Sequence, residues 1–184
     1  GAGELVGNRG VAGPPEGLVT NSGPCSVDFV GFGRVGDAGA FPGGKDGGPP
    51  NRYAAGTFKF WPLETPTPST GSVVAYVVPP GTIGVQDYGG AVGMDFDARS
   101  DIEITRLGVF DSGSDGLALT ITARIFNRET REEMVSVQFT PEDPGDPVDG
   151  SVFKDLATPL PLPAGFRGTI AAEGYGAAEL LGNN

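Results

Sequence analysis

The chain has 184 residues, a formal net charge of −11 at pH 7, no histidine and one cysteine. Without histidine the commonest general base and a common transition-metal ligand are missing, and a single cysteine excludes an internal disulfide. The acidic balance argues against nucleic-acid binding, because no basic patch is available to neutralise a phosphate backbone. No apolar run approaches the ~18 residues that cross a membrane.

Glycine and proline, at 32 and 17 residues, lie mostly before residue 90 and disfavour helix interiors. We therefore expect an all-β protein in two parts. Residues 1–71 are predicted to form a Gly/Pro-rich N-terminal extension with short strands, one or more of which it contributes to the fold, and residues 72–184 a β-sandwich domain. Cys25 sits beside an apolar run within the extension and is expected to pack as a small hydrophobe.

Alternation of apolar and polar residues with a period of two predicts strands along the whole chain. They are expected at 26–32, 56–61, 72–78, 92–97, 101–110, 117–127, 132–140, 151–157 and 167–174. Within 101–110 the apolar phase slips, which predicts a bulge near Thr105-Arg106. The polar segment 127–133 is predicted to connect a hairpin. Short strands about ten residues apart indicate an antiparallel β-sandwich, jelly-roll-like.

Two motifs bear on function before any fold is known. The run GFGRVG at 31–36 matches G-x-G-x-x-G, but turn residues rather than a helix follow it, which excludes that type of nucleotide site. The proline-threonine stretch at 62–71 favours an extended conformation. Its hydroxyls are candidate sites for O-linked sugars, at Thr65, Thr67, Ser69 and Thr70.

Clustered aspartates make calcium the one cofactor for which the chain offers ligands. Calcium takes six to eight oxygen ligands, and loop carboxylates at one end of a sandwich supply such oxygens. The candidate ligands are Asp95, Asp97 and Asp101, with Asp111 and Asp115 in the loop DSGSDG. The alternative is that aspartate and glycine simply form turns.

Four aromatic residues could present a flat face to a sugar or to a partner protein. They are Trp61, Tyr53, Tyr88 and Tyr175. For the tyrosines the alternative is ordinary packing in the core or in an interface.

Residues from about 78 to 181 resemble an uncharacterised β-sandwich module of secreted bacterial proteins, which often neighbours laminin-G-like and sugar-binding domains. The matching residues include Tyr88-Gly89-Gly90, Gly93-Met94-Asp95-Phe96-Asp97, Leu107-Gly108-Val109-Phe110-Asp111-Ser112-Gly113, Phe153-Lys154-Asp155-Leu156, Leu162-Pro163-Ala164-Gly165-Phe166-Arg167-Gly168 and Glu173-Gly174-Tyr175-Gly176. The resemblance implies a non-catalytic extracellular β-sandwich. The chain begins at glycine, so we expect a processed protein whose leader has been removed, located outside the cell or at its surface.

These observations predict a structural protein without enzymatic activity, a subunit of a filament, sheath or surface layer whose partner is itself. An extended N-terminal segment costs about 1–2 kcal/mol per residue to order, and strand packing against a neighbouring subunit would offset that cost. The alternative is a carbohydrate-binding or adhesion module, possibly calcium-dependent, with polysaccharide as partner. A glycosidase would need two facing carboxylates, which the spacing does not indicate.

Overall fold

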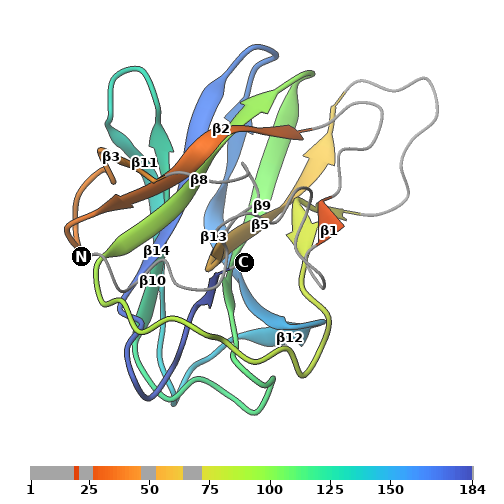
Figure 1. The fold of residues 1–184 in the computed structure, drawn as a ribbon. Coiled ribbons are helices and arrows are strands. Elements are labelled where there is room, and N and C mark those ends of the chain that lie inside the picture. The colour runs from red at the N-terminus through yellow and green to blue at the C-terminus, as the bar shows by residue number, and fades with distance from the viewer. Residues whose placement is uncertain (1–18, 21–26, 47–52, 64–71, 184) are drawn as a thin grey trace.

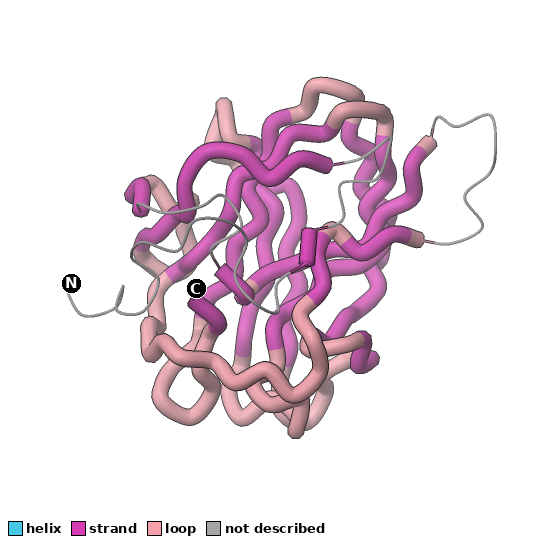
Figure 2. Tube along the Cα trace, turned by 45° about the vertical axis from the view of Figure 1, so that its right-hand side comes forward, coloured by secondary structure: helices cyan, strands magenta, loops and turns pink. Residues whose placement is uncertain are grey.

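The structure is a computed structural model that describes residues 19–20, 27–46, 53–63 and 72–183. Every regular element in this part of the chain is a strand (Figure 2). Accordingly, the described residues contain no helix that could cross a membrane. The expected all-β class is confirmed.

Two antiparallel sheets make up the sandwich (Figure 1). The larger has six strands in the order β11 (Glu133–Phe139), β10 (Ile121–Asn127), β14 (Arg167–Glu173), β8 (Ala91–Ala98), β2 (Val27–Gly36) and β3 (Gly44–Asp46). The smaller has five strands in the order β12 (Asp146–Val148), β13 (Ser151–Leu162), β9 (Ile102–Phe110), β5 (Gly56–Pro62) and β6 (Val73–Val74).

Two short ladders complete the described structure. One joins β1 (Val19–Thr20) to β7 (Tyr76–Val77), and the other joins β4 (Tyr53–Ala54) to β15 (Gly182–Asn183). The predicted strand at 72–78 is thus divided into two strands that pair with different partners.

The core lies between the two sheets and is built from the alternate residues that the period-two pattern marked as apolar. Phe58 of β5 packs on Phe96 of β8 with ring centroids 5.0 Å apart, a contact that joins the sheets. Other buried members of the same cluster are Phe60, Met94, Ile102, Ile104, Leu107, Phe110, Ile121, Ile125, Phe139 and Ile170.

The predicted irregularity of the 101–110 strand is confirmed. Lys59 pairs with Arg106 and Phe60 with Ile104, so Thr105 is skipped in the ladder between β5 and β9. The predicted hairpin is also confirmed, because β10 and β11 pair antiparallel on either side of the 127–133 connection.

Strands from the predicted N-terminal extension lie inside the sandwich. β2 lies between β8 and β3, and β5 lies between β9 and β6. Both strands carry core side chains, including Val27, Phe58 and Phe60. A division at 71/72 would therefore remove an inner strand from each sheet.

Candidate functional site

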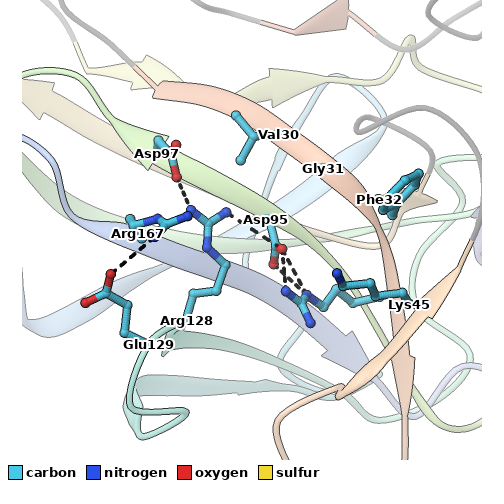
Figure 3. Close-up of a pocket in the computed structure, with 10 residues that line it drawn as sticks. Val30, Gly31, Phe32, Lys45, Asp95, Asp97, Arg128, Glu129 and Arg167 are labelled. Atoms are coloured by element: carbon cyan, nitrogen blue, oxygen red, sulfur yellow. Dashed lines mark hydrogen bonds and ion pairs between the residues drawn. The ribbon is translucent and has the colours of Figure 1, made fainter.

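A groove of about 580 Å³ lies on the outer face of the six-stranded sheet. Figure 3 shows its lining, in which charged side chains converge from several strands. The lining residues are Val30, Gly31, Phe32 and Arg34 of β2, Lys45 of β3, Asp95 and Asp97 of β8, Arg167 of β14, and Arg128 and Glu129 of the turn between β10 and β11. This volume is within the range of small-molecule sites.

The strand register explains why these side chains meet. Asp95 on β8 lies opposite Val30 on β2 and Thr169 on β14, and Asp97 lies opposite Arg167. Directly opposed residues in a sheet point to the same face, and residues two apart on one strand do so as well. The groove is therefore formed by side chains of neighbouring strands rather than by a single loop.

Asp95 is the buried centre of the groove, with 5% of its surface exposed. Thr169 Oγ1 donates a hydrogen bond to Asp95 Oδ1 at 2.5 Å. Arg34 Nε donates to the same oxygen at 2.8 Å, and Arg34 Nη2 donates to Oδ2 at 2.6 Å. The carboxylate charge is thus compensated by a bidentate guanidinium contact, the geometry in which arginine binds carboxylate most strongly.

The Arg34 side chain is held on a second side by an aromatic ring. Its guanidinium carbon lies 5.1 Å from the ring centroid of Phe41, and Phe41 packs edge-on against Phe126 at 5.7 Å. A cation over an aromatic face is stabilised by the ring quadrupole. Arg34 is therefore fixed in one orientation before any ligand arrives.

Arg128 stands between the two aspartates of β8 (Figure 3). Its Nη2 donates to Asp97 Oδ1, and its Nη1 is 3.7 Å from Asp95 Oδ2. On the neighbouring strand, Arg167 Nη1 donates to Glu129 Oε1 at 3.3 Å. The groove wall is thus a row of alternating positive and negative groups.

The rim of the groove carries an exposed aromatic side chain. The ladder between β2 and β8 shifts register between Val30 and Gly33, which places Gly31 and Phe32 in a bulge. Gly31 has φ of +76°, a conformation that glycine adopts without strain. Phe32 is 50% exposed as a result. Bulges commonly re-aim a side chain beside a functional site.

The structure separates the predicted calcium ligands. Asp95 and Asp97 are paired with arginines, whereas Asp101 Oδ1 accepts a hydrogen bond from the Ala164 amide at 2.7 Å. Asp111 accepts from the Gly116 amide, so the DSGSDG loop closes on its own first residue. No group of three or more Asp, Glu, His or Cys side chains suited to a metal forms among the described residues. Calcium binding stays a prediction.

The DSGSDG loop surrounds a carboxylate that the sequence did not single out. Glu179 is 3% exposed and accepts hydrogen bonds from the amides of Ser112 and Ala118 at 2.9 and 2.8 Å. Burial raises the pKa of Glu179, and the nearby charges of Asp111 and Asp115 raise it further. Burial also raises the pKa of Asp111. These acids anchor the loop to the C-terminal segment.

Among the predicted aromatic ligand residues, the three tyrosines are directed inwards. Tyr53 and Tyr175 are buried, and the Tyr175 hydroxyl is 3.1 Å from the carbonyl oxygens of Ala55 and Phe110. The half-buried Tyr88 donates to the Gly36 carbonyl at 3.0 Å. The three tyrosines therefore do not form an exposed platform, because Tyr88 and Tyr175 hold backbone carbonyls and the buried Tyr53 hydroxyl donates to the Asp46 carboxylate. Trp61 is 37% exposed, on the other sheet from the groove.

Several predicted residues lie outside the described part of the chain. They are the candidate O-glycosylation sites Thr65, Thr67, Ser69 and Thr70, together with Cys25.

The sequence pattern did not single out the cations of the groove or Phe32 as site residues. One local signal was available, since Asp95 and Asp97 on one strand and Arg167 and Thr169 on another each occupy alternate positions of a single face. Which strands are neighbours, however, is a property of the fold.

No protein-family model matches this sequence, and no solved structure matches it. The chain is similar to UDP-GalNAc:beta-1,3-N-acetylgalactosaminyltransferase 2 of Xenopus laevis and of Xenopus tropicalis. Each is 35% identical over 94 residues, which is 50% of this chain and 19% of the relative. The Danio rerio protein of the same name is 32% identical over 92 residues, 50% of this chain and 18% of the relative. The match thus spans about a fifth of the length of these curated relatives.

The similarity contradicts two predictions. A self-assembling filament, sheath or surface-layer subunit is wrong, and so is the prediction of a protein without enzymatic activity, because the relatives are named as glycosyltransferases.

Proposed function

We propose that this chain is a carbohydrate-handling β-domain of a glycosyltransferase-type enzyme, and that it holds a sugar in the groove on the outer face of the six-stranded sheet. Two independent observations support the proposal. One is the similarity to enzymes named for transfer of N-acetylgalactosamine. The other observation is that exposed Phe32 and paired arginines and aspartates line the same groove, and it is the one that assigns the site.

The groove offers both kinds of contact that a sugar ring can use. Sugar hydroxyls are donors and acceptors at once, and Asp97 with Arg128 supplies an acceptor beside a donor. The C–H face of a sugar is apolar, and Phe32 at the rim provides an apolar surface of matching kind. A preformed pocket with a few fixed polar groups and an aromatic side chain is the general form of a small-molecule site.

Saturation-transfer NMR with the methyl β-glycoside of N-acetylgalactosamine and with UDP-GalNAc tests the proposal. We expect transfer to sugar protons in the native chain and its loss in Phe32→Ala. Trp61→Ala is the matched control, because it removes an exposed aromatic ring from the opposite sheet. Release of UDP from UDP-GalNAc in the presence of glycan acceptors is followed on the same samples.

If Trp61→Ala lost sugar binding and Phe32→Ala kept it, the sugar site would lie on the five-stranded sheet instead. Absence of transfer to either probe, together with no UDP release, would overturn the proposed function. The extracellular location and the polysaccharide partner stay predictions.

A further inference from the structure

We infer that the groove selects an acidic sugar, one that carries a carboxylate, over a neutral one. The inference rests on the proposed function, because it names the ligand class of the same groove. Its basis is the placement of cations. Four of the chain's 12 lysines and arginines line the groove (Arg34, Lys45, Arg128, Arg167), against three acids (Asp95, Asp97, Glu129). The groove is thus locally +1 (4 − 3) on a chain of net charge −11.

Not all four cations are available to a ligand. Arg34 is engaged by Asp95 on one side and by Phe41 on the other. The remaining three have donors to spare. Lys45 is exposed, and no ion pair among the described residues involves it. Arg167 pairs only with Glu129, through a contact in which the side chains are 56% and 66% exposed. Such surface pairs contribute roughly 0–1 kcal/mol, so a ligand anion can displace one.

Arg128 has donors to spare although it lies deeper, at 10% side-chain exposure. Its Nη2 is bonded to Asp97, but its Nη1 is 3.7 Å from Asp95 Oδ2, beyond hydrogen-bond distance. A guanidinium carries five N–H donors in a fixed plane. Part of that set is therefore left for an acceptor in the groove.

The backbone sets Arg128 beside Arg167. The Arg128 amide donates to the Arg167 carbonyl at 2.9 Å, which ties the turn after β10 to the start of β14. Both side chains line the groove (Figure 3). Two adjacent guanidinium groups match the two oxygens of a carboxylate in the bidentate manner that arginine favours. Phe32 lies at the other end of the groove, on the Lys45 side of Asp95, where it is placed to contact a neighbouring ring of a bound oligosaccharide (Figure 3).

Phosphate is the other oxyanion that arginine pairs recognise, and a nucleotide diphosphate could supply it. The test therefore uses separate probes for the two sources. The acidic sugar is an unsulfated chondroitin tetrasaccharide, which alternates glucuronate with N-acetylgalactosamine. Its matched neutral form is the same tetrasaccharide after reduction of the carboxyl groups to alcohols. Inorganic phosphate and UDP are the phosphate probes.

Isothermal titration calorimetry on the full chain measures the Kd of each probe. We expect carboxyl reduction to weaken binding by about tenfold, the effect of losing one charge-assisted hydrogen bond of ~1.4 kcal/mol. Arg167→Gln and Lys45→Gln alter exposed side chains and should each weaken binding of the acidic form several-fold, with little change for the neutral form. Lys154→Gln on the five-stranded sheet makes the same change of net charge and should leave Kd unaltered.

Equal affinity for the acidic and reduced tetrasaccharides would overturn the inference. If, in that case, Phe32→Ala abolished binding of both tetrasaccharides, the proposed function would still hold. Tighter binding of phosphate or UDP, in competition with the tetrasaccharide, would overturn the carboxylate assignment in favour of a phosphate. No binding of either tetrasaccharide would overturn the inference. If the N-acetylgalactosamine probes also fail to bind and no UDP is released, the proposed function is overturned as well.

Discussion

Arg34 on β2 and Asp95 on β8 form a bidentate ion pair, 61 residues apart in sequence, whose side chains are only 13% and 7% exposed. The pair crosses the sheet at the bulge that presents Phe32. The pair therefore stabilises the sheet and also holds the groove in its shape.

Asp95→Asn should lower the free energy of unfolding by about 3 kcal/mol, because it leaves the guanidinium groups of Arg34 and Arg128 without their shared counter-charge. Urea denaturation measures the change. Asp28→Asn is the matched control, since Asp28 pairs with the 70% exposed side chain of Arg99. That pair should contribute far less, because solvent screens an exposed ion pair. Equal losses in the two variants would contradict a buried role for Asp95.

Gly168→Ala tests the close approach of β14 to an aromatic ring. A Cβ at position 168 would lie 2.2 Å from Cζ of Phe96, its partner across the ladder. The ring must move within a packed core, so we expect destabilisation of about 1–3 kcal/mol, seen as a lower denaturation midpoint. Gly43→Ala is the control, because its Cβ would meet nothing closer than 3.9 Å. A neutral Gly168→Ala variant would show that the ring has room to move.

Glu179→Gln should remove a pH dependence of stability. The pKa of Glu179 is raised in the folded state, so the folded chain binds this proton more tightly than the unfolded chain. Its contribution to stability is therefore present below the ordinary pKa of 4.5 and is lost as the pH rises through the folded pKa. On acidification from pH 7 to 5, the native chain should gain more stability than the variant. Denaturation at both pH values, with exposed Glu132→Gln as control, measures the difference.

The same variant should be less stable at pH 7, by about 1–3 kcal/mol, because a glutamine amide cannot accept from the amides of both Ser112 and Ala118. A variant as stable as the native chain, with the same pH profile, would rule out this role of Glu179.

Tyr175→Phe should lower the free energy of unfolding by about 1 kcal/mol without changing sugar affinity. Its hydroxyl is buried against the carbonyl oxygens of Ala55 and Phe110, where water cannot replace it. Thermal unfolding and calorimetric titration of one preparation give both quantities. Reduced affinity with unchanged stability would restore Tyr175 as a ligand residue.

Much of the fold was predictable because the signals are local. The alternation in residues 121–127 and 133–139 identifies two strands, and the polar segment between them identifies their connection. The phase slip at Thr105 likewise predicted the irregularity in β9. Periodicity does not report partners, however. The pattern predicts that the N-terminal part contributes strands, but only the fold shows that β2 and β5 are inner strands of the two sheets.

The site was less predictable because its parts are distant in sequence. Asp95 and Asp97 were expected to face a calcium ion, but the register places arginines from β2 and from the turn after β10 against them. An aspartate that binds a metal and an aspartate that pairs with an arginine of a neighbouring strand cannot be told apart in the sequence. Only the neighbouring strand distinguishes them.

That this protein is made of strands follows from local patterns of the chain, because side-chain alternation and the cost of glycine and proline in helices act over a few residues. The tertiary structure alone decided that Asp95 is a buried partner of arginine, that Tyr175 is a core residue, and that Phe32 is exposed beside the groove. Burial and ion pairing depend on contacts between residues that lie 61 or more positions apart in the sequence, which no local pattern reports.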